Sequence, residues 1–118
     1  MPADKPVDSS TLRTLDLGAA RARIAAGRAD ASGFLDACAE AARQPSCGRA
    51  LLTQGFEQGR ATARRIDRLL DAGAPLPPLA GLALSLKDLF DVEGQVTPAG
   101  SIVLADTAPA ASDANRLV

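Results

Sequence analysis

The sequence predicts an α/β fold in which a helical N-terminal part leads into a β-strand. Three observations support this prediction. Residues 10–71 repeat apolar side chains at spacings of three and four, which is typical of amphipathic helices. Residues 72–78 are rich in glycine and proline, which interrupt regular structure. Leu82–Lys87 then alternates leucine with smaller or polar residues, as a strand with one buried face does.

Composition narrows the possible functions. The chain has 118 residues, a formal net charge of −1 and 3% aromatic residues, so neither nucleic acid nor a membrane surface is an expected partner. It contains no histidine, and we expect neither a metal nor a cofactor. Cys38 and Cys47 do not form a Cys-x-x-Cys pair, and we interpret them as reduced thiols. With no secretory signal in the first ten residues, we expect a cytoplasmic protein.

The helical part begins after a flexible N-terminus at residues 1–9. Ser10 or Thr11 can cap a first helix that runs to about Ala26, and Gly27 is placed to end it. The arginines of its last turns suit the negative end of a helix dipole and are interpreted as a solvated face: Arg21, Arg23 and Arg28.

Two further helices follow. Ser32 can cap one from about Gly33 to Arg43, which Pro45 ends. A longer one is predicted from about Arg49 to Asp71. Its polar side alternates acids with arginines, which favours an exposed face of ion pairs over a nucleic-acid site. The predicted pairs are Glu57–Arg60, Arg64–Asp67 and Arg68–Asp71.

Lys87 ends the predicted strand, and its role has two interpretations. On the strand it would share a face with Ala83 and Ser85, opposite the leucines. If it is buried there, desolvation lowers the pKa of its amine, which could then act as a base. If it lies at the surface, its methylenes cover leucines while the ammonium stays in water. Position alone favours the surface reading, because most lysines at strand ends are solvated.

The loop after Lys87 carries further candidate residues. Asp88 and Asp91 are predicted to fix the loop by hydrogen bonds and not to bind a metal, because no histidine accompanies them. Gly94 suits a tight turn and Gly100 allows a close backbone approach. A last helix could open at Ala114, capped by Ser112 or Asp113.

The residues from Pro78 to Ser101, called the motif below, resemble the amidase signature family. The resemblance rests on Pro78-Leu79-Ala80-Gly81, on Leu84-Ser85-Leu86-Lys87-Asp88-Leu89-Phe90-Asp91-Val92-Glu93-Gly94, and on Thr97-Pro98-Ala99-Gly100-Ser101. It implies an amide hydrolase with a Ser–cis-Ser–Lys triad, in which Lys87 is the catalytic lysine. Asp88, Asp91, Gly94, Thr97, Gly100 and Ser101 would then structure the loop beside it, and Ser101 is read as a structural hydroxyl.

The resemblance also implies an architecture. Residues 10–76 would be a helical N-terminal segment, and residues 77–118 the start of an α/β core with a mixed β-sheet and helices on both faces. The family's catalytic serines lie in a glycine- and serine-rich segment, and this sequence contains no such run. We therefore expect an incomplete piece of the fold, truncated before those serines and inactive as an isolated chain.

Two alternatives remain open. The chain could be a non-catalytic helical interaction module, or it could belong to the amidase subunit of a tRNA-dependent amidotransferase. For a parent amidase the expected partner is a small-molecule amide, and the resemblance leaves open a homo-oligomer of the parent.

Overall fold

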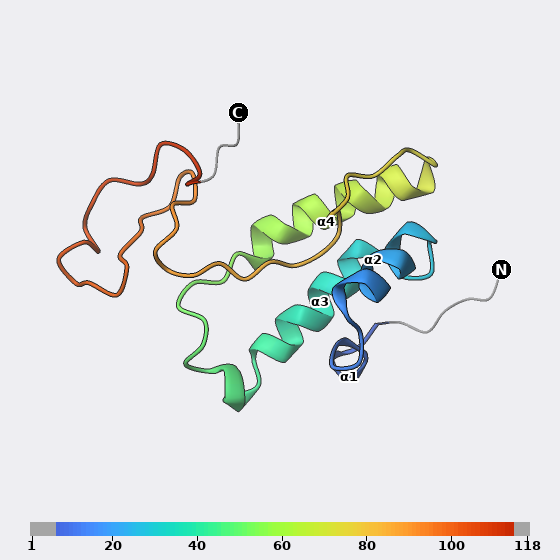
Figure 1. The fold of residues 1–118 in the computed structure, drawn as a ribbon, viewed down its shortest axis with the longest axis horizontal. Coiled ribbons are helices and arrows are strands. Elements are labelled where there is room, and N and C mark those ends of the chain that lie inside the picture. The colour runs from blue at the N-terminus through green and yellow to red at the C-terminus, as the bar shows by residue number, and fades with distance from the viewer. Residues whose placement is uncertain (1–6, 115–118) are drawn as a thin grey trace. The chain divides into compact units, whose positions relative to one another are not determined.

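The computed structural model describes residues 7–114, and over these residues it contains four α-helices, one short 3-10 helix and no β-strand. The chain divides into two compact units, Met1–Ala83 and Leu84–Val118, called the helical unit and the C-terminal unit (Figure 1). All helices of the described residues lie in the helical unit. The sequence predicted a boundary between residues 76 and 77. The two units divide a few residues later, after Ala83, because the chain up to Leu82 still packs on the helices.

The first predicted helix is divided into two. Helix α1 spans Ser9–Leu12 and α2 spans Leu17–Ala25. Neither Ser10 nor Thr11 is the N-cap: Asp8 caps α1 by accepting from the backbone N–H of Thr11, and Asp16 caps α2 by accepting from that of Ala19 at 2.7 Å. Aspartate side chains compete with helix continuation by bonding nearby backbone groups, so a new helix begins at Asp16 although the apolar spacing continues.

Helix α3 spans Ala31–Ala42, with Asp30 instead of the predicted Ser32 as its N-cap. After the 3-10 turn Pro45–Cys47, helix α4 spans Phe56–Asp71. The third helix therefore begins seven residues later than predicted. The residues between the 3-10 turn and α4 run from Gly48 to Gly55. Leu52 among them is largely exposed, so its packing does not offset the conformational entropy that the two glycines would lose in a helix.

The core of the helical unit is small and rich in alanine. Helix α3 packs against α4 and α1, and Gly59 of α4 lets Leu35 of α3 approach closely. The buried residues Ala20, Ile24 and Phe34 form the central cluster. Partly buried side chains from before α2, from the last turn of α4 and from the chain after α4 cover it, including Leu12, Leu15, Leu70, Leu76 and Leu82.

The C-terminal unit consists of turns and irregular chain over its described residues 84–114, and none of these residues is buried. Its segments 91–95 and 110–114 are joined by backbone hydrogen bonds from Gly94 N to Ala110 O, from Ala110 N to Gln95 O and from Ala114 N to Asp91 O, each 2.9 Å. Gly94 has φ +79°, and the first two bonds give it the pattern of a G1 β-bulge. These bonds hold the unit together in place of a core.

The predicted strand Leu82–Lys87 has no strand assignment here. The amides of residues 83–89 make no hydrogen bond within the described residues, and Leu84 and Leu86 are 80% and 55% exposed. A strand requires a neighbouring backbone to pair with, and residues 7–114 offer none to this stretch. The α/β class with a mixed sheet is therefore not confirmed by the described residues.

Candidate functional site

Lys87 lies in the C-terminal unit, and its side chain is exposed. Burial on an apolar strand was one of the two interpretations of this residue, and the structure does not show it, because the leucines on either side are exposed as well. The carbonyl of Lys87 accepts a hydrogen bond of 3.1 Å from the amide of Phe90, so the lysine opens a tight turn. This turn fixes the backbone directly after the lysine.

Two segments of the motif, residues 88–91 and 97–100, are hydrogen-bonded to each other inside the C-terminal unit. The half-buried Asp88 accepts from the backbone N–H of Gly100 through Oδ2 at 3.2 Å. Asp91 accepts from the hydroxyl of Thr97 through Oδ1 at 2.7 Å. Carboxylates bond more strongly than neutral acceptors, so each can hold a loop that lacks regular structure. These two bonds hold the chain from Thr97 to Gly100 against the residues that follow Lys87.

Residues Pro98–Ser101 form a turn, with the amide of Ser101 donating to the carbonyl of Pro98 at 2.8 Å. Both central residues have positive φ, +48° at Ala99 and +74° at Gly100, as in a type I′ turn. Ala99 is the sole residue other than glycine with positive φ among those described. An alanine in this conformation costs about 1 kcal/mol or more, and surrounding contacts must hold it there.

Ser101 has a local structural bond. Its Oγ accepts from the backbone N–H of Val103 at 3.3 Å, and the residue is half-buried. The structure also shows a contributor that the sequence prediction placed in another role: Asp113 accepts from the backbone N–H of Glu93 at 2.8 Å. Past Ala114 itself, the helix predicted to open there lies outside the described residues. An aspartate twenty residues away in sequence carries no local pattern that points to this bond.

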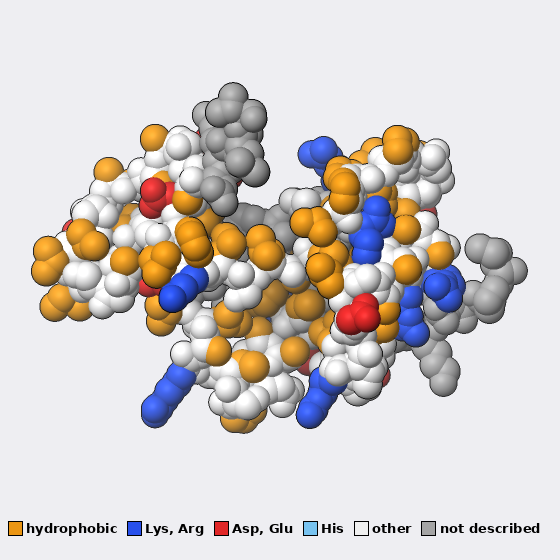
Figure 2. All heavy atoms as spheres, in the orientation of Figure 1, with side chains coloured by type: hydrophobic (Ala, Val, Ile, Leu, Met, Phe, Trp, Pro, Cys, Tyr) orange, Lys and Arg blue, Asp and Glu red, His pale blue; other side chains and the backbone are white. Residues whose placement is uncertain are grey.

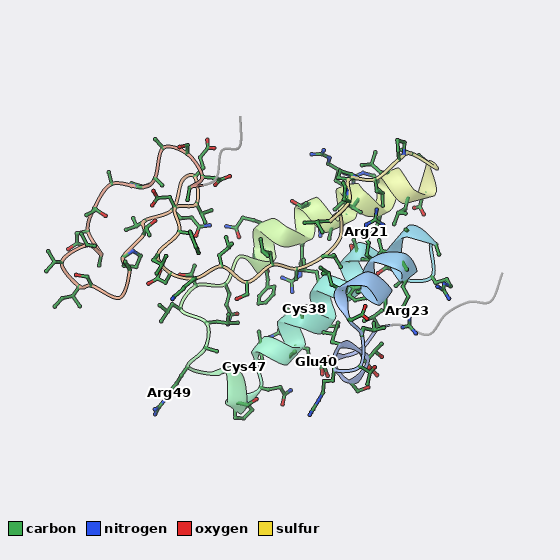
Figure 3. The ribbon with its side chains drawn as sticks, in the orientation of Figure 1. Arg21, Arg23, Cys38, Glu40, Cys47 and Arg49 are labelled. Carbon is green, nitrogen blue, oxygen red and sulfur yellow. The ribbon has the colours of Figure 1, made fainter. Side chains whose placement is uncertain are left out.

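The described residues contain no cluster of three or more His, Cys, Asp or Glu side chains arranged to hold a metal ion. Cys38 and Cys47 are both half-buried free thiols, and burial raises the pKa of the Cys38 thiol (Figure 3). Among the described helices none is long and apolar enough to cross a bilayer.

Apolar side chains are unusually exposed around the motif. The large ones in the C-terminal unit that stand in solvent are Leu84, Leu86, Leu89, Phe90, Ile102, Val103 and Leu104. Figure 2 shows hydrophobic side chains spread over the visible face of this unit. Soluble monomers seldom expose so many together, so this unit carries a surface suited to packing.

Comparison with known proteins gives a consistent result. The family model described as Amidase matches residues 33–116. The chain is 40% identical over 95 residues to the AtzE subunit of the 1-carboxybiuret hydrolase of Pseudomonas sp. (strain ADP), covering 77% of this chain and 20% of that protein. It is 38% identical over 88 residues to the 2-amino-5-chloromuconic acid deaminase of Comamonas testosteroni, covering 74% and 19%.

A third relative is named for a different activity. The chain is 48% identical over 56 residues to a glutamyl-tRNA(Gln) amidotransferase subunit of Mycolicibacterium gilvum (strain PYR-GCK), covering 47% of this chain and 11% of that protein. The chain thus spans about a fifth or less of the length of these curated relatives.

Solved structures agree. A chain from a vestigial protein complex, reported to reveal the evolutionary origins of an s-triazine catabolic enzyme, matches with a TM-score of 0.78 and 32% sequence identity. The match covers 84% of this chain and 22% of that one. An inhibitor-bound form of the complex matches with a TM-score of 0.69 and 36% identity.

Proposed function

Because the chain belongs to the amidase signature family, we propose that it carries the catalytic lysine of an amide hydrolase, and that this lysine is Lys87. The observation that carries the proposal is the pair of hydrogen bonds, Asp88 to Gly100 and Asp91 to Thr97, that join residues 88–91 of the motif to residues 97–100. They hold the loop beside the lysine without using the lysine itself. Its amine is left available for chemistry.

The proposed reaction uses a serine nucleophile. Neutral Lys87 takes a proton from a bridging cis-serine, which in turn takes the proton of the nucleophilic serine as that oxygen attacks the carboxamide carbon. The C–N bond breaks, ammonia or an amine leaves with a proton, and an acyl-enzyme remains. Water then attacks the ester, and the carboxylic acid is released. Backbone N–H groups would stabilise the oxyanion.

The two serines are the part of the triad that this sequence does not contain. In the family they lie in a glycine- and serine-rich segment, and no such segment is present here. The proposal therefore concerns the whole protein to which this sequence belongs. For residues 1–118 by themselves we expect no hydrolysis of simple amides.

A second candidate function rests on the exposed apolar side chains of the C-terminal unit. A non-catalytic interaction module would use this surface to bind another polypeptide. A third candidate, the amidase subunit of a tRNA-dependent amidotransferase, rests on the 48% identity to the amidotransferase relative. It would release ammonia from glutamine by the same lysine-dependent chemistry.

The test is substitution of Lys87 in the whole protein, with a panel of small amides and glutamine as substrates. Lys87→Ala should abolish turnover. Lys87→Arg should do so nearly as completely, because a guanidinium stays protonated and cannot accept the serine proton. Lys5→Ala is the control, since Lys5 is the other lysine of the sequence and lies outside the motif. Turnover by Lys87→Arg above a few per cent of wild type would exclude Lys87 as the base.

A further inference from the structure

An arginine of the helical unit contacts the start of the motif. After α4 the chain turns back and passes α2 (Figure 1); its stretch Pro77–Leu82 is called the returning segment here. Arg21 of α2, labelled in Figure 3, donates through Nε to the carbonyl of Pro78 and through Nη2 to that of Pro77, the latter at 3.3 Å. All of these groups lie within the helical unit.

The sequence of the returning segment explains why an external donor is useful. Pro77 and Pro78 have no backbone N–H, so these two residues cannot donate a backbone hydrogen bond. Their carbonyls can still accept, and a guanidinium presents several N–H groups in one rigid plane. Arg21 places two of them on two successive carbonyls. The single side chain thus restrains both prolines at once.

The restraint continues from the prolines toward the lysine. The amide of Ala80 donates to Pro77 O at 3.1 Å, and that of Leu82 to Leu79 O at 3.3 Å, so two consecutive turns follow the contact with Arg21. Gly81 then lies against Ile24 and Ala31, and Leu82 packs on the central cluster. Beyond Ala83 the chain leaves the helical unit, and Lys87 follows after three more residues.

We propose that Arg21 is a positioning residue for Lys87: it fixes the end of the helical unit from which the lysine-bearing chain continues. The inference rests on the proposed function of Lys87. Without the guanidinium, the proline carbonyls return to water and the returning segment gains conformational freedom. Lys87 then spends less time in its reactive position, and catalysis is sensitive to misplacements of this kind.

We expect the loss of the Arg21 side chain to change both kcat and the protection of nearby amides from hydrogen exchange. In the whole protein, Arg21→Ala should lower kcat about tenfold or more while KM changes little, because the substrate contacts are not removed. Hydrogen exchange at Ala80 and Leu82 should become about tenfold faster. Arg21→Lys should recover part of both, since an ammonium can bond one carbonyl but lacks the planar arrangement of donors.

Arg23→Ala is the matched control. It removes the same type of side chain from the same helix, and the Arg23 side chain makes no hydrogen bond to residues 7–114. It should leave kcat and the exchange of Ala80 and Leu82 at wild-type values. If Arg21→Ala prevents folding, Arg21→Gln is compared with Arg23→Gln, because the glutamine amide NH2 can still donate to a proline carbonyl but cannot reproduce the guanidinium.

The outcomes separate this inference from the proposed function. If Lys87→Ala is inactive and Arg21→Ala matches Arg23→Ala in both measurements, the positioning role is overturned while Lys87 remains the base. If Arg21→Ala speeds exchange but keeps full kcat, the anchor exists without a role in catalysis, and the positioning role is again overturned. If Lys87→Ala stays active, the proposed function fails, and the inference fails with it.

Discussion

Asp67 of α4 binds Ser32 of α3 twice, accepting from its backbone N–H at 3.2 Å and from its hydroxyl at 2.6 Å. The other carboxylate oxygen accepts from the N–H of Ala31 at 2.6 Å. A helix start leaves its first N–H groups without partners in the helix, and here a neighbouring helix supplies the acceptor. The carboxylate also lies at the positive end of the α3 dipole.

Removing this carboxylate should destabilise the helical unit. We expect Asp67→Ala to lower the free energy of unfolding by about 1–3 kcal/mol, because partly buried N–H groups lose a charged acceptor. Asp67→Asn should cost less, since its amide oxygen can still accept. Asp71→Ala, one turn further on and outside these bonds, is the control. Urea unfolding followed by helical circular dichroism measures the change; equal midpoints for Asp67→Ala and Asp71→Ala would contradict the role.

Gly81→Ala should be more harmful than the same change at Gly73. Both glycines have positive φ, +84° and +67°, so alanine is strained at either. At Gly73 a methyl group would meet nothing within 4 Å, whereas at Gly81 it would lie 3.0 Å from Cδ1 of Ile24. We expect a loss of about 1 kcal/mol at Gly73 and about 1–3 kcal/mol more at Gly81. Thermal unfolding of the two variants compares them directly, and indistinguishable transitions would show that the core yields to the methyl.

Asp88→Ala and Ser101→Ala should affect folding or substrate affinity more than the chemical step. Their contacts, to the amides of Gly100 and Val103, shape the loop and involve no neighbouring base. Pre-steady-state acylation of the whole protein with a chromogenic ester reports the chemical step separately. Should Ser101→Ala alone remove the acylation burst while the fold persists, Ser101 would have to be assigned as the nucleophile.

The amides of Ala83–Leu89 should exchange quickly with solvent in the isolated chain. None of them donates a hydrogen bond among the described residues, whereas those of Gly94 and Ala110 do. Hydrogen exchange by NMR compares the two groups within one sample. Strong protection of Leu84–Lys87 in monomeric protein would show that this stretch is paired after all.

The N-terminal helix should respond to acid at low pH. The hydroxyl of Ser10 and the amide and hydroxyl of Thr11 hydrogen-bond the Asp8 carboxylate and lower its pKa from 3.8 to about 2. Because the folded pKa is the lower one, this contribution to stability is present above about pH 4 and is lost as the pH falls toward 2. NMR titration of the Asp8 carboxyl, with Asp8→Asn as the control, tests it; a midpoint near 3.8 would refute the cap.

Much of the helical unit could be predicted from sequence because helical spacing is a local signal. The spacing locates the segments of α2, α3 and α4, and the ends of α2 and α4 before Gly27 and Gly73 agree with glycine's role after a helix. The exact starts could not be predicted. Several polar residues could cap each helix, and which aspartate does so depends on small differences in local geometry.

Long-range polar contacts could not be read from the sequence. Asp67 was expected to pair with Arg64 across a turn, and it binds the start of α3 instead; of the predicted pairs, Glu57–Arg60 is present in the described residues. Arg21 was interpreted as part of a solvated face, yet it contacts Pro77 and Pro78. The motif located the candidate site by resemblance. Whether Lys87 is buried depends on which residues pack over it, and the alternation of side chains in one segment does not specify those residues.

Among the described residues, the side chains of Arg21, Ile24 and Ala31 that contact the returning segment precede it in the chain. Arg21, Ile24 and Ala31 have been synthesised long before Gly81 is. Translation adds ~5–20 residues per second, and N-terminal domains generally fold first. The helices can therefore form and receive Gly81 while the ribosome is still adding the rest of the polypeptide. A nascent chain arrested after residue 83 would already contain Arg21, Ile24 and Ala31, so the segment that precedes the lysine could be held before the lysine emerges.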